Sequence, residues 1–227
     1  MDGNKITVSG LDAGTYVLSV ATIVDANHIA AVKNVTVTVN KLATSIASSA
    51  VSAVYKDSKY LVATLKDAQG KAVAGAEIST NIKGLNKMTT DSNGQVKWLV
   101  GSLTPKNYDV VLTFAGNANY VKSTQKVTVK VAKATPKMTA KAKTFKKSVK
   151  TKKYSVTLKD NKGKAIKKAK LTLKVKGKTY KATTNAKGVA TFKITKLTKK
   201  GKHKATVKYA GSAYYKGITK KYTVKVK

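Results

Sequence analysis

The feature of this chain that most constrains its fold is internal repetition, which runs through nearly all of its 227 residues. The stretch YLVATLKDAQGKAVAGAEIST begins at Tyr60 and reappears from Tyr154 as YSVTLKDNKGKAIKKAKLTL. Further along, LTFAGNANYVKS returns as VKYAGSAYYKGI, which aligns Tyr120 with Tyr215. A period of ~90 residues indicates a folded unit that occurs more than once in the chain.

The first 40 residues match only the second half of this unit. GLDAGTYVLSV corresponds to SLTPKNYDVVL, which aligns Tyr16 with Tyr108. We therefore predict residues 1–41 as the C-terminal half of a truncated repeat, 42–132 as a complete repeat, and 133–227 as a complete, Lys-rich repeat. Because the chain opens in mid-repeat, we interpret its start as that of a fragment, so the lack of a signal peptide says little about location.

Each complete repeat contains about seven short runs rich in Val, Thr, Tyr and Ile, separated by turn sequences such as Asp160-Asn161-Lys162-Gly163. In residues 221–227, a Tyr and two Val alternate with Lys and Thr, as in a strand with one buried and one solvated face. This spacing predicts a sandwich of two antiparallel sheets. We expect Trp98, the single tryptophan, to anchor the core of the second repeat.

Two motifs recur in the same order in both complete repeats: Thr-Thr-x-x-x-Gly in TTDSNGQ and TTNAKGV, and AGNANY or AGSAYY before the last strand. With KDAQGKAVAGAEIST and VTVKV, they resemble the bacterial immunoglobulin-like repeats found in tandem in surface adhesins, invasins and archaeal adhesin-like proteins. The Lys-dense, Arg-free last repeat is similar to the C-terminal repeats of adhesin-like proteins of methanogenic archaea. The resemblance implies an all-β chain of tandem immunoglobulin-like antiparallel β-sandwiches, a non-enzymatic adhesin or stalk segment at the cell surface or cell wall.

Positive charge is concentrated in the last repeat. The net charge of the chain is +37, and every one of its 46 basic residues is Lys. Residues 1–132 carry 14 Lys and eight acids, whereas residues 133–227 carry 32 Lys and a single acid, Asp160. The two parts of the chain are therefore expected to meet different partners, or to meet one partner differently.

Residues for catalysis or metal binding are scarce. We interpret His28 and His203 as surface or loop histidines, because neither has an acid at catalytic or metal-ligand spacing. The segment Asp91-Ser92-Asn93-Gly94 resembles half of a calcium loop without the later Glu, so we interpret it as a turn. We therefore predict no enzyme activity, no cofactor, no metal and no small-molecule substrate.

The sequence also predicts no insertion into a membrane. It contains no run of ~18 apolar residues, which a spanning helix needs. It contains no amphipathic helix with a basic face, the usual element of membrane-surface binding. Cysteine is absent, so the chain has no disulfide framework and no thiol nucleophile.

The lysine-rich stretch 168–204 has two interpretations. Its alternation, with Lys170 and Lys174 on one side and Leu171 and Leu173 on the other, is what any half-buried strand shows. The equivalent stretch of the preceding repeat, AEISTNIKGLNKMTTDSNGQVKWLV, carries three lysines and two acids, so the fold does not require the charge. We therefore predict a polyanion-binding surface, with these candidate residues: Lys170, Lys174, Lys176, Lys178, Lys181, Lys199, Lys200, Lys202 and Lys204.

The type of basic residue indicates the partner. Reading of bases and stacking on them depend on Arg and on exposed aromatic side chains, whereas the Lys ammonium suits diffuse contact with an anionic polymer. We expect an anionic cell-wall polymer or glycan, or the surface of another cell. The alternative is a protein that binds nucleic acid without sequence specificity, because phosphate neutralisation by Lys alone suffices for that.

Overall fold

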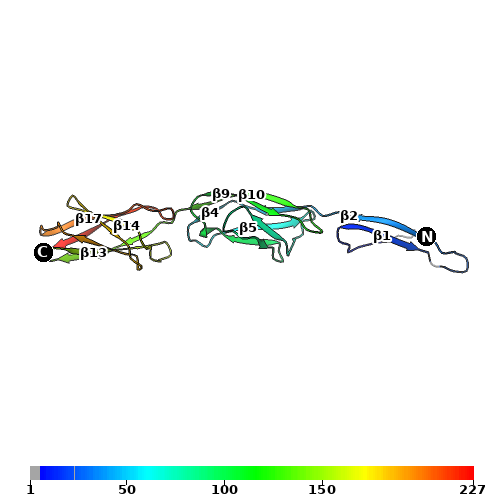
Figure 1. The fold of residues 1–227 in the computed structure, drawn as a ribbon, viewed down its shortest axis with the longest axis horizontal. Helices are drawn as coiled ribbons and strands as arrows, with labels where there is room; N and C mark the ends of the chain where they lie inside the picture. Colours follow the sequence, from blue (N-terminus) through cyan, green and yellow to red (C-terminus); the bar gives the residue numbers. More distant parts are fainter. Residues whose placement is uncertain (1–5, 23) are drawn as a thin grey trace. The chain divides into compact units, whose positions relative to one another are not determined.

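The computed structural model describes residues 6–22 and 24–227. Its regular elements are strands and one short 3-10 turn, as the Val-, Thr- and Tyr-rich alternating runs predict (Figure 1). In the described part of the chain, no helix is long and apolar enough to cross a membrane. The strands are β1 (Gly14–Ala21), β2 (Val32–Val39), β3 (Thr44–Ser48), β4 (Val51–Val54), β5 (Tyr60–Asp67), β6 (Glu77–Thr80), β7 (Met88–Thr89), β8 (Gln95–Leu99), β9 (Asn107–Phe114), β10 (Ser123–Ala132), β11 (Lys137–Thr139), β12 (Lys143–Phe145), β13 (Lys152–Lys159), β14 (Lys170–Val175), β15 (Lys178–Thr183), β16 (Val189–Ile194), β17 (Gly201–Tyr209) and β18 (Ile218–Val226), with the 3-10 turn η1 (Val100–Ser102) after β8.

The two complete repeats have the same sheet topology. Strands β3-β5-β8 form a three-stranded sheet and β4-β10-β9-β6-β7 a five-stranded one. The last repeat matches this strand for strand, as β11-β13-β16 and β12-β18-β17-β14-β15. This division of strands between two sheets is that of an immunoglobulin-like sandwich, so the predicted fold class is confirmed. Strands β1 and β2 form a separate antiparallel pair.

Each five-stranded sheet also contains one parallel pair, which the sequence did not predict. Strand β4 runs parallel to β10, with Val51 opposite Val129. Strand β12 runs parallel to β18 in the same way, with Lys143 opposite Val224. The pairing arises because the entering segment crosses from the small sheet to the edge of the large one within a few residues.

The chain divides into two compact units. Within the described residues, the first comprises the chain up to Ala50, Leu61–Trp98 and Tyr108–Thr128. The second comprises Val51–Tyr60, Leu99–Asn107 and Val129–Lys227, and thus contains strands β11–β18 entire. The repeat boundaries expected from the sequence, 41/42 and 132/133, remain predictions.

Alternating side chains build the core of the last sandwich. Tyr154 and Phe192 from the small sheet pack with Leu171, Val207 and other buried residues of the large sheet in one apolar cluster. In β18, Val224 and Val226 are buried while the intervening lysine and threonine are exposed, as predicted from the period of two. Burial of each large apolar side chain stabilises the fold by about 1.5 to 3 kcal/mol. The core therefore fixes which face of each strand remains for solvent.

In the preceding repeat, Trp98 is 3% exposed, and its indole N–H donates a hydrogen bond to the carbonyl of Asn86 at 2.7 Å. The prediction of Trp98 as a core anchor is confirmed. Strands β1 and β2 differ, because none of their residues is buried. In the complete repeats the equivalent strands, β9 and β10 or β17 and β18, lie in a sheet that continues on both sides.

The two recurring sequence motifs have structural roles. Thr184 is buried, and its hydroxyl donates to the carbonyl of Ile166 and accepts from the N–H of Ala169. Thr90 makes the same two bonds, with Val73 and Ala76, in the preceding repeat. The motif thus ties the loop before β14 to the end of β15, and the loop before β6 to the end of β7.

The AGxxxY motif holds the segment that enters each repeat. The N–H of Ala134 donates to the carbonyl of Tyr214, and the N–H of Lys216 donates back to Ala134. Leu42 exchanges the equivalent bonds with Asn119 and Val121. The motif is therefore explained by chain connection, without any ligand.

Candidate polyanion-binding surface

The outer face of the large sheet in the last repeat consists of lysine and threonine. Side chains alternate along a strand, so every second residue points into the core and the residues between them point to this outer face. We call it the lysine–threonine face and define it by residues of the five strands β15, β14, β17, β18 and β12. Its members are Thr179, Lys181, Thr183, Lys170, Thr172, Lys174, Lys202, Lys204, Thr206, Lys208, Thr219, Lys221, Thr223, Lys225 and Thr144.

The strand register arranges these residues as a checkerboard. Thr172 of β14 lies opposite Lys181 on one side and Lys208 on the other. One position along, Lys174 lies opposite Thr179 and Thr206, so lysine and threonine exchange places. The same alternation continues from β17 to β18 and from β18 to β12, in the pairs Lys204–Thr223, Thr206–Lys221, Lys208–Thr219 and Lys225–Thr144.

A single cross-strand pair on this face breaks the alternation, because Lys202 lies opposite Lys225. Like charges directly opposite each other destabilise a sheet, and a threonine opposite each lysine avoids most of that cost. The threonines at positions 172 and 206 are half-buried while the neighbouring lysines are exposed. The face therefore presents ammonium groups on long stems above a layer of hydroxyls.

Five of the nine residues predicted from the sequence lie on this face: Lys170, Lys174, Lys181, Lys202 and Lys204. The other four lie elsewhere in the last repeat. Lys176 lies in the β14–β15 turn with a positive φ of 47°, Lys178 shares the side of β15 that Tyr180 occupies, and Lys199 and Lys200 precede β17.

Sequence reasoning omitted three lysines that the structure brings to the face: Lys208, Lys221 and Lys225. The alternation of residues in β17 and β18 indicates that these lysines are exposed. Their place on the face also depends on the pairing of these strands with each other and with β14. The pairing is a tertiary fact, because β17 and β14 lie about 30 residues apart in the sequence.

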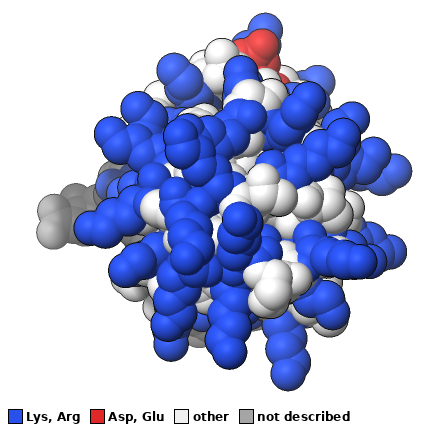
Figure 2. Space-filling model, turned by 90° about the vertical axis from the view of Figure 1, so that its left-hand side faces the viewer, with Lys and Arg blue, Asp and Glu red and all other residues white. Residues whose placement is uncertain are grey.

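No acid neutralises these lysines in the described part of the chain. Its ion pairs are Asp25–His28, Lys56–Asp160 and Lys87–Glu77, and none includes a lysine of the face. Figure 2, which looks at the chain from the side where Figure 1 draws the last repeat, shows lysine over most of the visible surface. A surface of one sign attracts polyanions over distances of about a Debye length.

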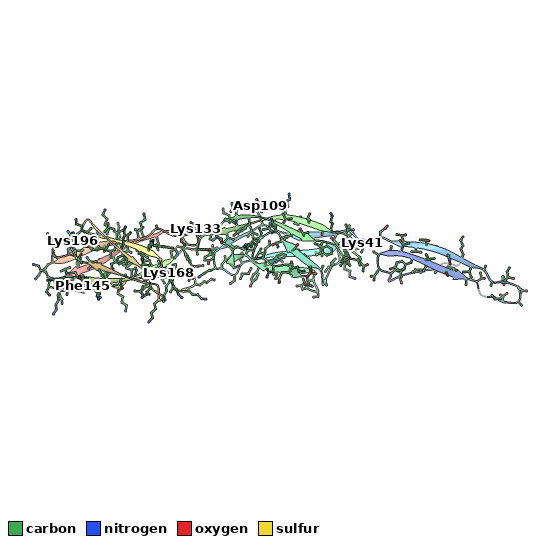
Figure 3. All side chains as sticks on the ribbon, in the orientation of Figure 1. Lys41, Asp109, Lys133, Phe145, Lys168 and Lys196 are labelled. Carbon is green, nitrogen blue, oxygen red and sulfur yellow. The ribbon has the colours of Figure 1, made fainter. Side chains whose placement is uncertain are left out.

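The equivalent face of the preceding repeat carries charges of both signs. Glu77 occupies the position of Lys170, Asp109 that of Lys204, and Thr113 that of Lys208. Asp109 projects from β9 in Figure 3, and Glu77 forms an ion pair with Lys87 at 2.7 Å. The two repeats share one strand order, so the charge of this face is not a consequence of the topology.

The single acid of the last repeat, Asp160, is buried and has a structural role. Its carboxylate accepts a hydrogen bond from the Lys56 ammonium at 2.8 Å and two from the backbone N–H groups of Lys162 and Lys164. Burial raises the pKa of Asp160, but these bonds lower it more, and the net pKa lies below its ordinary value. The hydrogen bond to Asp160 in turn raises the pKa of Lys56.

Three tyrosines complete this environment. The ring of Tyr55 lies 4.8 Å from that of Tyr214 and 5.8 Å from that of Tyr215. The Lys56 ammonium lies 5.8 Å from the Tyr55 ring centre and 5.9 Å from the Tyr215 ring centre. All these residues belong to the second compact unit, so Lys56 and Asp160 serve its stability and leave the lysine–threonine face without an acid.

A second group of lysines surrounds a shallow hollow in the last repeat. It is lined by Lys146, Lys147, Ser148, Lys200 and Lys227. Lys200 is the one residue of the predicted set that contributes to it. The hollow adds positive potential to the same repeat, but its side chains lie outside the checkerboard.

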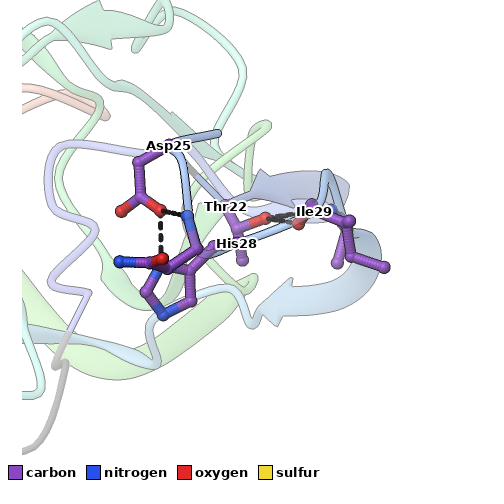
Figure 4. Close-up of polar contacts among 6 residues, drawn as sticks. Thr22, Asp25, His28 and Ile29 are labelled. Atoms are coloured by element: carbon purple, nitrogen blue, oxygen red, sulfur yellow. Dashed lines mark hydrogen bonds and ion pairs between the residues drawn. The ribbon is translucent and has the colours of Figure 1, made fainter.

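His28 is an exposed turn residue, as predicted. Its Nδ1 lies 2.6 Å from the Asp25 carboxylate, close to the bond from the Thr22 hydroxyl to the carbonyl of Ile29 (Figure 4). The backbone N–H of Asn27 and the His28 side chain lower the pKa of Asp25. These contacts close the turn between β1 and β2.

The interpretation of His203 as a surface or loop histidine was wrong. His203 lies in β17, is 5% exposed, and its Nε2–H donates to the carbonyl of Lys199 at 2.7 Å. In the repeat alignment it occupies the position of Tyr16 and Tyr108, and the Tyr16 hydroxyl likewise donates to the carbonyl four residues upstream, that of Asp12. His203 therefore takes the place of the tyrosine corner of immunoglobulin-like sandwiches, which the alignment with Tyr108 would have indicated.

The calcium-like segment is a turn, as predicted. The Asp91 carboxylate accepts hydrogen bonds from the backbone N–H groups of Asn93 and Gln95. Among the described residues, no group of three or more His, Cys, Asp or Glu side chains is placed to hold a metal ion.

Comparisons with known proteins assign the chain to no family. No protein-family model matches the chain, and no curated protein matches it. Among solved structures, it is similar to invasin, a bacterial integrin-binding protein, with 23% identity, a TM-score of 0.49 and coverage of 80% of this chain and 39% of invasin. The Yersinia pseudotuberculosis adhesin InvE gives 15% identity and a TM-score of 0.39, with coverage of 80% and 58%.

Domains A168–A170 of titin are as similar in fold as invasin, with a TM-score of 0.49 at 9% identity and coverage of 82% of this chain and 66% of that one. The chain spans less than two thirds of the length of invasin and of InvE.

Proposed function

We propose that the chain is a segment of a non-enzymatic adhesin-like protein of the cell surface, a stalk of tandem immunoglobulin-like domains whose last repeat binds an anionic polymer. The observation that carries this proposal is the difference between two repeats of one topology. The preceding repeat folds with both signs of charge, whereas the last repeat has 32 lysines and one acid, which is buried against Lys56. The excess charge is thus available to a partner.

The polymer we propose is an anionic component of the cell wall or of a partner cell's glycans. A polycationic repeat is suited to hold a stalk on such a polymer by many weak contacts, each sensitive to salt. The resemblance to adhesin-like proteins of methanogenic archaea supports a location outside the cell and an archaeal source. The domain boundaries 1–41, 42–132 and 133–227 belong to this proposal.

Retention of the full chain on three supports tests this function. We expect isolated cell wall and immobilised heparin to retain the chain in ~0.15 M salt and to release it as the salt is raised. Cell wall whose carboxylates have been converted to amides is the matched control and should not retain it. If duplex DNA holds the chain tightly in ~0.2 M salt while cell wall does not, the nucleic-acid alternative replaces the adhesin.

A further inference from the structure

The checkerboard on the lysine–threonine face has a defined spacing. Neighbouring strands lie ~4.8 Å apart, and alternate residues along a strand lie ~6.7 Å apart. Lysines in one row across the strands, such as Lys181 and Lys208, are therefore separated by one threonine-bearing strand, a distance of ~10 Å. Between them lies the hydroxyl of Thr172.

Two such rows cross four strands. One runs Lys181, Thr172, Lys208, Thr219 and the next runs Thr179, Lys174, Thr206, Lys221. Each row offers an ammonium and a hydroxyl by turns, at a step equal to the strand spacing.

This step is close to the length of a sugar. A pyranose ring spans roughly 5 Å between its two glycosidic oxygens, given covalent bonds of about 1.5 Å. A polysaccharide laid across the strands therefore places one sugar over each strand. Where acidic and neutral sugars alternate, every acidic group meets a lysine, and every neutral sugar meets a threonine hydroxyl.

We infer that the lysine–threonine face binds an acidic polysaccharide in which acidic and neutral sugars alternate, lying across strands β15, β14, β17 and β18. This inference rests on the proposed function and names its polymer. The ammonium donates charge-assisted hydrogen bonds to the carboxylate or sulfate of the acidic sugar. The threonine hydroxyl donates to, or accepts from, the hydroxyl and amide groups of the neutral sugar.

The same geometry disfavours nucleic acid as the occupant of this face. Duplex DNA carries one charge per ~1.7 Å of axis, so a row of lysines ~10 Å apart leaves most phosphates unmatched. The face also lacks the arginine and aromatic side chains that read or stack on bases, because its members are lysine and threonine alone.

Two double variants of the full chain test the inference. K174T/K208T removes one lysine from the middle of each row and keeps a residue that strands favour. K159T/K193T removes two exposed lysines from the outer face of the small sheet and is the control of equal charge. Thermal unfolding by circular dichroism checks that both variants fold.

The probes are hyaluronan oligosaccharides, in which acidic and neutral sugars alternate, and oligogalacturonates of equal length, which are acidic at every sugar. Calorimetric titration in ~0.15 M salt should give at least a tenfold loss of hyaluronan affinity in K174T/K208T and no more than a twofold loss in K159T/K193T. The wild-type chain should bind hyaluronan more tightly per acidic group than oligogalacturonate.

Other outcomes overturn the inference in distinguishable ways. Equal losses in both double variants mean that charge acts diffusely, and they leave the proposed function intact. A preference for oligogalacturonate, or for DNA, that depends on Lys174 and Lys208 refutes the alternating sugar. Failure of the wild-type chain to bind any acidic polysaccharide or cell wall removes the inference and the proposed function together.

Discussion

Single residues show how the last repeat departs from its neighbours while keeping their fold. His203 replaces a tyrosine near the start of β17 and makes the same type of hydrogen bond to the carbonyl of Lys199, four residues upstream. Asp160 keeps the turn role of Asp67 and adds the contact with Lys56. The first is a replacement of one donor by another at a fixed backbone position, and the second is a contact added to a conserved turn.

Removing the corner hydrogen bond should destabilise the last sandwich. We expect His203→Phe to lower the free energy of unfolding by about 1 kcal/mol, because the carbonyl of Lys199 loses its donor. His203→Tyr is the matched control, since Tyr16 donates to Asp12 from the equivalent position, and it should retain stability. Urea unfolding at pH 7 measures both, and equal losses in the two variants would show that packing alone matters.

The ion pair of Asp160 predicts a pH dependence. The pKa of Asp160 is lower in the folded state than in the unfolded chain, so its contribution is present above the unfolded pKa of about 3.9 and is lost as pH falls through the folded pKa. We expect Asp160→Asn to destabilise the protein by about 1 to 3 kcal/mol at pH 7 and by much less at pH 2.

Asparagine at position 160 removes the negative charge and keeps the side-chain oxygen that accepts the backbone hydrogen bonds. Asn185 accepts backbone hydrogen bonds from Lys187 and Val189 in an equivalent turn, so an amide preserves the turn at position 160. Unfolding by guanidinium at the two pH values measures the difference. An equal loss at both pH values would mean that the Lys56 pair contributes nothing through charge.

At the scale of elements, the turns fix the spacing of the strands. Gly188 has a φ of +75°, and a Cβ there would lie 2.6 Å from the carbonyl oxygen of Leu158. Gly163 has a similar φ of +78°, but a Cβ there meets nothing within 4 Å. Substitution of Gly163 therefore tests backbone strain alone, whereas substitution of Gly188 tests the same strain together with a steric clash.

We expect Gly163→Ala to cost about 1 kcal/mol in free energy of unfolding, from the left-handed backbone alone. Gly188→Ala should cost at least 2 kcal/mol more, because β13 must move to accept the Cβ. Denaturant unfolding of the two variants checks this. Equal costs would show that β13 and the turn adjust freely.

The large sheet of the preceding repeat offers a gain-of-function test of the checkerboard. The variant E77T/D109T/T113K removes two acids from its outer face and puts a lysine at the position of Lys208. In the K174T/K208T background, we expect it to restore hyaluronan affinity at least fivefold. A charge-matched change on the outer face of the small sheet should restore none, and if it restores as much, total charge governs binding.

At the scale of the whole molecule, repulsion among the lysines destabilises the folded state. The chain carries a net charge of +37, and some of its lysines are neighbours in the fold, such as Lys202 and Lys225, which lie opposite each other on adjacent strands. Net charge of one sign destabilises a compact state by self-repulsion, and salt screens that repulsion. Binding of a polyanion removes the same repulsion, so ligand binding and stability are linked.

We therefore expect the melting temperature to rise by several degrees between ~10 mM and ~300 mM NaCl, because the Debye length falls from about 30 Å to well below 10 Å. Differential scanning calorimetry at pH 7 measures the shift. A fall in melting temperature over this range would mean that attractive pairs such as Lys56–Asp160 outweigh the repulsion among lysines.

The sequence by itself determined the repeat, the all-β class, the exposed sides of the strands at 170–175 and 221–227, and the core role of Trp98. All of these follow from local pattern, because a period of two and turn residues act within a few positions of the chain. It also located the charge in residues 133–227 and five of the lysines on the face.

Only the tertiary structure decided the features that depend on contacts between residues distant in the sequence. Lys208 joins the face because β17 lies next to β14. Lys178 does not, because it lies on the opposite side of β15. His203 is buried because it lies on the same side of β17 as the core residues Ala205 and Val207. The checkerboard itself is a product of register. One residue of slip in any strand would exchange its inward and outward side chains, and the buried core prevents that slip.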